Sequence, residues 1–288
     1  MTNDQSPTTN DHRPMTNHQR LLAQQGETAR QQGQYDEAIA HFTEAIALNF
    51  EYAWAIAHRG ETYYQMGQYH KALVDFNRAV ELNPNHVWAI AHRGVTYERL
   101  ERYPETLADL NRVLELKPDY PWAIAYRCRA YEMMGRYEEA LQEFDQAIAL
   151  DETIIKDWVT ERGLILSFMG CYSEAMVYYQ QALQETPDNH LTLYCIAFTK
   201  TRWQGLAAAQ VDINKAKAIL HRMEKTHDSS AVIYELGGLA ALEGQTEMAL
   251  DYLEKAIFLD YLPRRRALHD LAWLDLHGDP RFQALIAP

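Results

Sequence analysis

Apolar residues in the central part of the chain recur in the same order every 34 residues. The aligned copies are YAWAIAHRGETYYQMGQY from Tyr52, HVWAIAHRGVTYERLERY from His86 and YPWAIAYRCRAYEMMGRY from Tyr120. In the first copy, apolar residues follow a helical spacing over 54–66 and again over 70–82. Gly67 separates these stretches, and Asn83–Pro84 ends the second because proline cannot continue a helix. The pattern predicts helix pairs that must stack to bury their apolar faces.

The repeated residues resemble the tetratricopeptide repeat (TPR) family, whose signature is a small residue, a tyrosine, a glycine turn, a second tyrosine, two alanines and a closing proline. In one copy these residues are Gly60, Tyr63, Gly67, Tyr69, Ala72, Ala79 and Pro84. The resemblance covers about residues 19–262. It implies an all-α fold, a right-handed superhelical solenoid of about seven antiparallel helix pairs. The implied units lie near 19–52, 53–86, 87–120, 121–155, 156–189, 190–229 and 230–262.

The ends of the chain depart from the repeat. Residues 1–18 are polar and are expected to form a disordered tail. The sixth unit, near 190–229, is degenerate, because GLAAAQVDIN adds about seven residues before the helix that contains Ala216. Residues 263–288 are expected to form capping helices over the last repeat. The expected covering side chains are Leu268, Leu271, Trp273, Leu274 and Phe282.

The first helix of each pair has a face that points away from the second helix. In TPR arrays this face lines a concave groove, so the resemblance implies an open groove that binds a polypeptide. Two interpretations of the recurring tryptophans stay open. Each indole packs on the preceding loop, at Tyr52, His86 or Tyr120, or it contacts a ligand. The predicted partner-binding residues are Trp54, Trp88, Trp122, Tyr64, Glu98 and Glu132.

Charged residues also recur at fixed spacing within the helix pairs. An arginine precedes the small-residue position, and an acidic residue follows sixteen residues later on the facing helix. The pairs are Arg59 with Asp75, Arg93 with Asp109, and Arg127 with Glu143. Structural ion pairs are the favoured interpretation, because a partly buried guanidinium needs a partner. A phosphate or carboxylate receptor is the alternative. Arg162, opposite Tyr178, departs from the rule.

Motifs for phosphate binding, catalysis or metal binding are absent from the sequence, and we predict no catalytic residue, metal or cofactor. His58 and His92 recur on neighbouring pairs, about 10 Å apart, which is too far to share a metal. Rim positions are expected for both. Some TPR proteins hold chaperone C-terminal tails with a clamp of lysine, asparagine and arginine. The corresponding positions are Ala23, Glu27, His58, Trp88 and His92, so binding of chaperone tails is not predicted.

Composition narrows the range of partners and locations. The formal net charge of -13 argues against nucleic-acid and anionic-membrane partners, which require a basic surface. The three cysteines are an odd number at irregular spacings, which is typical of a reducing compartment. The first residues lack a secretory signal pattern. We therefore expect a cytoplasmic location.

The sequence favours a non-enzymatic adaptor or scaffold that binds a peptide segment of a protein partner in its concave groove. Similar repeats also occur as sensor arrays attached to bacterial signalling proteins, and the AWAIAHRG segment resembles those arrays. A regulatory sensor that binds a small molecule or short peptide is therefore the alternative. The identity of the partner does not follow from the fold.

Overall fold

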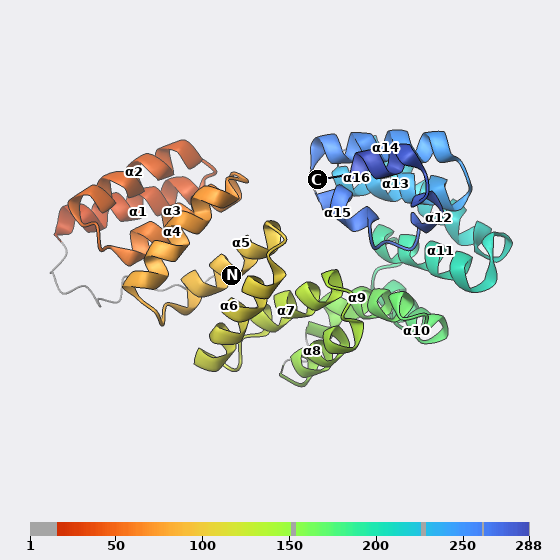
Figure 1. Ribbon diagram of the computed structural model, residues 1–288, viewed down its shortest axis with the longest axis horizontal. Helices are drawn as coiled ribbons and strands as arrows, with labels where there is room; N and C mark the ends of the chain where they lie inside the picture. Colours follow the sequence, from red (N-terminus) through yellow and green to blue (C-terminus); the bar gives the residue numbers. More distant parts are fainter. Residues whose placement is uncertain (1–15, 151–153, 226–228, 261, 288) are drawn as a thin grey trace. The chain divides into compact units, whose positions relative to one another are not determined.

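The computed structural model describes residues 16–150, 154–225, 229–260 and 262–287. Over these residues it contains sixteen α-helices, one 3-10 helix and no strand (Figure 1). The chain divides into two compact units. The N-terminal unit comprises residues 1–134 and 142–150, and the C-terminal unit comprises 135–141 and 151–288. Most of the predicted polar tail lies outside the described residues, and its last two residues already belong to the first helix.

The N-terminal unit is a row of helical hairpins. Its helices are α1 (Asn17–Gln31), α2 (Tyr35–Leu48), α3 (Ala53–Gln65), α4 (Tyr69–Leu82), α5 (Val87–Arg99), α6 (Tyr103–Leu116) and α7 (Pro121–Met133). The next helix, α8 (Tyr137–Leu150), is divided between the two units. From α1 to α7 each helix packs against the next one in the chain, so the helix pairs expected from the 34-residue period are present there.

Small residues allow the two helices of a pair to approach closely. A Cβ atom at Gly60 on α3 would lie 3.2 Å from the Asp75 Cβ and 3.3 Å from the Ala72 carbonyl oxygen on α4. Phe76 and Ala79 of α4 are fully buried beside this crossing. The sequence positions that define the repeat are therefore the positions where backbone and aromatic side chains interlock.

The hairpin turns require a left-handed backbone conformation. Gly33, Gly67 and Gly135 adopt it with φ of 76°, 72° and 69°. In the third hairpin Glu101 occupies this position with φ of 61°, the one positive φ of a non-glycine residue in the described chain. A side chain at such a φ costs about 1–2 kcal/mol, because its Cβ approaches the following carbonyl oxygen.

Replacing Glu101 by glycine is expected to raise the free energy of unfolding by about 0.5–1 kcal/mol. The removed strain exceeds the entropy that glycine adds to the unfolded chain. Urea denaturation followed by circular dichroism measures the change. Gly67→Ala is the matched control and should lower the unfolding midpoint. A lower midpoint for Glu101→Gly would show that the glutamate side chain contributes more than the strain costs.

The α-helices of the C-terminal unit vary more in length, from 6 to 19 residues. They are α9 (Ile154–Phe168), α10 (Tyr172–Glu185), α11 (His190–Gln204), α12 (Leu206–Glu224), α13 (Ser230–Leu242), α14 (Thr246–Leu259), α15 (Leu262–Ala267), the 3-10 helix η1 (Leu274–Leu276) and α16 (Pro280–Ile286). The residues added in the degenerate unit do not form a loop. Apart from Gly205 they belong to α12, which is 19 residues long because its added residues are good helix formers with a buried Ala209.

The segment after α14 covers part of the last repeat. Trp273 and Phe282 are fully buried, and Leu271 packs against the core. Leu268 and Leu274 are 44% and 40% exposed, so the expectation that they are covering side chains is wrong. Leu268, just after α15, and Leu274, the first residue of η1, face outward, while Trp273 faces inward.

Candidate functional site

The first helices of the pairs lie next to one another in the N-terminal unit. Contacts join α1 to α3, α3 to α5 and α5 to α7. We call the face of these four helices that points away from the second helices the inner wall. It contains the six residues predicted from the sequence to bind a partner, on α3, α5 and α7. Five of them are partly exposed, whereas Glu98 is buried.

A continuous stack of rings runs along the inner wall. We call it the aromatic ladder, and its successive rings are Trp54, His58, Trp88, His92, Trp122 and Tyr126. Their centroids are separated by 3.9, 4.6, 4.1, 5.8 and 4.3 Å. Trp88 and Trp122 therefore each pack between a ring on their own helix and a ring on the preceding first helix, and Trp54 is the first ring of the ladder. The ladder links three hairpins through side chains rather than through the backbone.

The three tryptophans have features of both interpretations given above, packing on the preceding loop and contact with a ligand. Each indole lies within about 6 Å of the ring that precedes its helix, Tyr52, His86 or Tyr120. Each is nevertheless only half-buried, so part of its surface faces solvent. The indoles are thus held rigidly and remain partly accessible, which leaves partner contact as a proposal.

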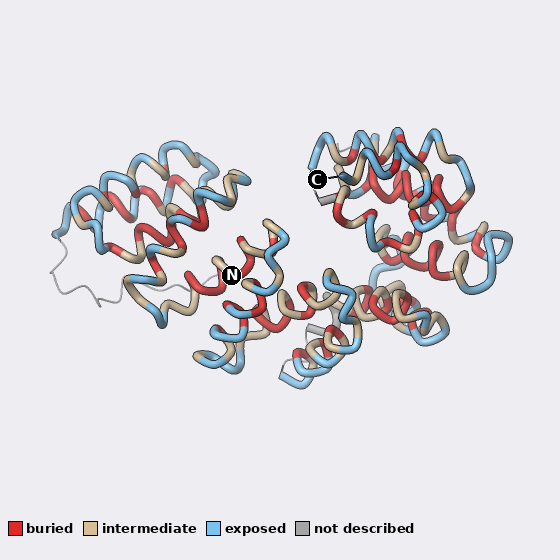
Figure 2. The backbone as a smooth tube through the Cα atoms, in the orientation of Figure 1, coloured by how far each residue is buried: buried red, intermediate tan, exposed pale blue. Residues whose placement is uncertain are grey.

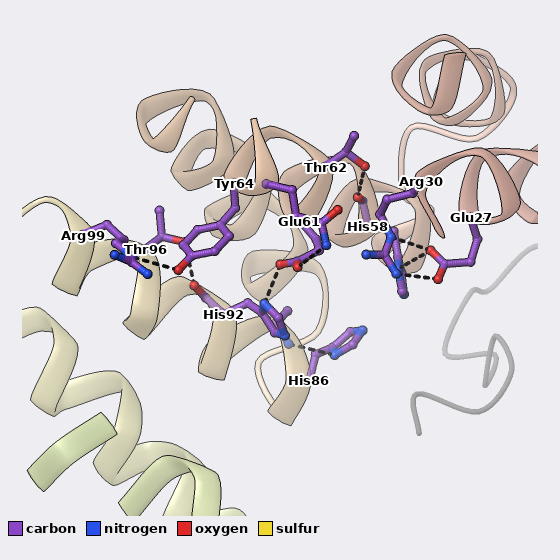
Figure 3. Close-up of polar contacts among 12 residues, drawn as sticks. Glu27, Arg30, His58, Glu61, Thr62, Tyr64, His86, His92, Thr96 and Arg99 are labelled. Atoms are coloured by element: carbon purple, nitrogen blue, oxygen red, sulfur yellow. Dashed lines mark hydrogen bonds and ion pairs between the residues drawn. The ribbon is translucent and has the colours of Figure 1, made fainter. Parts of the chain in front are cut away.

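His58 and His92 are buried, at 5% and 9% exposure, so the expected rim positions are wrong. Each imidazole is enclosed because it stacks between two indoles. Its Nδ1 atom faces a carboxylate of the preceding hairpin: His58 lies 3.2 Å from Glu27 Oε2, and His92 lies 2.6 Å from Glu61 Oε2 (Figure 3). Within the described residues, no group of three or more potential ligands could hold a metal ion.

The histidine and its carboxylate change together along the array. Glu27 with His58 and Glu61 with His92 are both 31 residues apart. One repeat further along the chain, Val95 stands at the position of the glutamate and Tyr126 at the position of the histidine. A buried imidazole is thus present where a carboxylate faces it, and a tyrosine is present where the carboxylate is absent. This is the pattern expected if burial of a polar ring requires a partner.

Glu27 has the most strongly perturbed carboxylate of the inner wall. Burial raises its pKa, but hydrogen bonds and charge from His58 and Arg30 outweigh burial and hold the pKa well below its usual value. The Arg30 guanidinium donates to both oxygens, at 2.8 Å from Nε and 2.6 Å from Nη2. The folded state therefore favours the ionised form of Glu27.

Replacing Glu27 by glutamine is expected to lower the unfolding temperature at neutral pH. Because the pKa is lower in the folded than in the unfolded state, the carboxylate stabilises the fold above about pH 4.5 and loses this effect as the pH falls further. The difference between wild type and Glu27→Gln should thus shrink below that pH. Calorimetry at several pH values measures it, with the exposed Glu44→Gln as control. A difference that is independent of pH would contradict the assignment.

Two arginines that the sequence analysis missed lie beside the other predicted residues. Arg99 Nε donates to the Tyr64 hydroxyl at 3.0 Å, and Arg129 Nη2 donates to the buried Glu98 at 2.9 Å. The Arg129 guanidinium also stacks over the Tyr126 ring, 4.4 Å from its centroid. Arg129 follows Glu98 by 31 residues, the same spacing as the histidine pairs, and this repeated spacing was the available signal.

The recurring arginine and acidic residues form ion pairs between the two helices of each hairpin. Nitrogen–oxygen distances are 2.8 Å for Arg59–Asp75, 2.6 Å for Arg93–Asp109 and 2.5 Å for Arg127–Glu143. Each guanidinium also donates to a polar side chain of the preceding hairpin, namely Thr43, Asn77 and Asn111. The guanidinium groups therefore join adjacent hairpins. Arg162 stacks over the ring of Tyr178, 5.1 Å from its centroid.

Comparisons with known proteins identify the repeats. Family profiles described as tetratricopeptide repeat match residues 53–86, 97–153 and 160–189, and one described as TPR repeat matches 26–67. These matches confirm the predicted family. No curated protein matches the chain.

Solved structures share the fold at low sequence identity. A tetratricopeptide repeat protein from Parabacteroides merdae is 16% identical with a TM-score of 0.73, covering 94% of this chain and 98% of its own. PilF of Pseudomonas aeruginosa is 16% identical with a TM-score of 0.59, over 70% of this chain and 91% of its own. YrrB, described as a TPR protein with an unusual peptide-binding site, is 20% identical with a TM-score of 0.51, over 62% and 91%. The all-α solenoid class predicted from the sequence is confirmed.

The described helices are also informative about membrane insertion. None of them combines the length and the apolar composition that crossing a bilayer requires.

Proposed function

Because this chain belongs to the tetratricopeptide repeat family, we propose that it is a non-enzymatic adaptor whose inner wall in the N-terminal unit binds a peptide segment of a protein partner. The observation that supports this proposal most directly is the aromatic ladder. Its indoles are partly exposed, and those of Trp88 and Trp122 are held by ring contacts on both sides. Rigid, partly exposed aromatic rings are the side chains that contribute most to protein interfaces.

The charges of the inner wall support a ligand bound mainly through apolar and aromatic contacts. Glu27, Glu61 and Glu98 are each paired with a basic side chain of the wall itself. A partner would have to break these pairs in order to use them, at the cost of leaving a buried charge without compensation. Preformed side chains lose little conformational entropy on binding, which favours affinity. YrrB, whose fold is similar, is itself described as having a peptide-binding site.

Site-specific photocrosslinking tests the proposal. A photoreactive amino acid is placed at Tyr64 or Glu132 on the inner wall, and at Val74 on α4 as the control. Val74 is 68% exposed and lies on the second helix of its hairpin. We expect one partner to crosslink from both inner-wall positions and not from Val74. Equal crosslinking from Val74, or crosslinking from Val74 alone, would contradict the proposed surface.

Two further expectations stay predictions. The predicted cytoplasmic location is tested by imaging the tagged protein in cells. The alternative function, a regulatory sensor, is tested by a thermal-shift screen with metabolites and short peptides. A ligand of the sensor would raise the unfolding temperature as its concentration rises.

A further inference from the structure

The segment that follows α14 extends beyond the end of the last repeat and reaches the first helix of the preceding one. Arg202 on α11 donates from Nε to the Leu271 carbonyl oxygen at 2.9 Å and pairs with Asp275 at 2.9 Å. Trp273 lies over α13, where a Cβ atom at Gly237 would be 2.8 Å from the indole. Residues 263–277 therefore lie along the first helices of the C-terminal unit (Figure 1). We call residues 263–277 the return segment.

Two tyrosines anchor the return segment on α11 and α13. Tyr194 and Tyr234 precede Ala197 and Gly237, the small residues at the helix crossings, by three positions. In the N-terminal unit, Ala57 and Ala91 of the inner wall precede their small crossing residues by the same three positions. The tyrosines therefore belong to the inner face of the C-terminal unit, and both hydroxyls donate to Asp270 Oδ2, at 2.8 and 2.9 Å.

Asp270 is fully satisfied although it is only 2% exposed. Its Oδ1 atom accepts the Ala272 backbone N–H at 2.9 Å, in addition to the two hydroxyls on Oδ2. Burial raises the pKa of Tyr194 and of Tyr234 well above the usual value, so both hydroxyls remain protonated donors. The Arg266 guanidinium lies over the Tyr234 ring, 5.2 Å from its centroid, and adds a positive charge near the carboxylate. The arrangement has the chemistry of a carboxylate receptor.

The inner faces of α11 and α13 are closed. On α13, every residue from Val232 to Leu242 is buried, and on α11 every residue from Thr192 to Thr199 is buried (Figure 2). On α3 of the N-terminal unit, by contrast, Trp54, Tyr63, Tyr64 and Gln65 keep partial or full exposure. The expectation of an open groove is therefore wrong for α11 and α13, because the return segment lies over that face.

We infer that the inner face of the C-terminal unit is a polypeptide-binding site for a segment with an aspartate anchor, and that the return segment is its built-in occupant. Asp270 binds to the hydroxyls of Tyr194 and Tyr234, and Trp273 fills the apolar space beside Gly237. The occupied face excludes other polypeptides. An external partner is thereby confined to the N-terminal unit.

Binding of the return segment in trans tests this inference. The probe is a fluorescein-labelled synthetic peptide of residues 263–277, titrated against the full chain and followed by anisotropy. Wild type is expected not to bind it, since its site is occupied. The variant Asp270→Asn with Trp273→Ala is expected to bind it, because its own segment is weakened. A peptide with asparagine at 270 should bind that variant about tenfold more weakly, which corresponds to loss of a charged hydrogen bond.

Three outcomes of the titration would each contradict the inference. Equal binding by wild type and variant would show that the face is not occupied. Absence of binding by a folded variant would show that the face does not recognise the segment, and equal binding of the asparagine peptide would exclude Asp270 as the anchor. Because the probe is the chain's own sequence, these results do not depend on whether the inner wall of the N-terminal unit binds a partner.

A second variant covers the case in which the double variant does not fold. A Cβ atom at Gly238 on α13 would lie 2.2 Å from the Tyr194 hydroxyl oxygen, so Gly238→Ala must displace that hydroxyl from Asp270. Hydrogen exchange in residues 267–277 should then accelerate relative to α10. Gly278→Ala, where a Cβ meets open space, is the matched control and should leave exchange unchanged. Unchanged exchange in Gly238→Ala would overturn the inference.

Discussion

Replacing Trp273 by alanine will lower the free energy of unfolding of the C-terminal unit by about 3–5 kcal/mol. The indole is fully buried and lies between the rings of Tyr234 and Phe282, with centroid distances of 5.5 and 6.0 Å. It also packs against α13 at Gly237, which offers no side chain to occupy the vacated space. The variant therefore retains a cavity whose lining has lost its contacts.

Urea denaturation of the full chain, followed by circular dichroism, measures this loss, and hydrogen exchange assigns it to α13 and the return segment. Trp203→Ala is the matched control, because Trp203 belongs to the same unit but is 45% exposed. Its effect should stay below about 1 kcal/mol. Equal effects of the two substitutions would mean that the return segment does not hold Trp273 against α13.

Replacing Trp88 by alanine will lower the free energy of unfolding of the N-terminal unit by about 2–4 kcal/mol, less than for a fully buried ring. Trp88 stacks between His58 and His92 and meets the edge of Phe76, with a centroid distance of 6.3 Å. Its removal opens the centre of the aromatic ladder to water. Both imidazoles then lose an apolar neighbour at the same time.

Trp88→Phe is the informative comparison, because it keeps a ring between the two imidazoles while it removes part of the exposed indole surface. Its cost in stability should be less than half that of Trp88→Ala. Urea midpoints at neutral pH measure both. If partner binding is lost in Trp88→Phe while stability is largely kept, the indole is a contact residue. An alanine variant with the wild-type midpoint would contradict the structural role of the ladder.

The sequence predicts the helix pairs well because the residues that form them recur at equivalent positions. Gly60 and Phe76 meet within one hairpin, so a 34-residue period displays the contact in every copy. The same holds for Arg59 and Asp75, which are sixteen residues apart and change together. Local glycine turns, such as the one at Gly67, add the hairpin geometry.

The site was harder to predict because its contacts join different positions of different repeats. His58 meets Glu27 at a spacing of 31 residues, which an alignment at the repeat period places in separate columns. The signal was that the glutamate and the histidine are replaced together, by Val95 and Tyr126. This becomes visible only when residues 31 positions apart are compared with each other. Burial of the histidines follows from this pairing and could not follow from their helical face alone.

The return segment was underestimated for a different reason. Asp270 meets Tyr194 across 76 residues of chain, and no periodic pattern links them. One local feature did point to extra burial. The sequence of α13, SAVIYELGGLAAL, is apolar around nearly the whole helix, as expected for a helix that is covered on every side.

The pairing of each histidine with a carboxylate of the preceding hairpin limits how such an array can grow by gene duplication. An extra copy of residues 53–86 places every new imidazole over a glutamate, because that module contains both His58 and Glu61. An extra copy of residues 87–120 instead places a duplicated His92 over Val95 and buries an imidazole without its acid. The two modules are equal in length, yet only the first can be inserted in tandem without a compensating substitution.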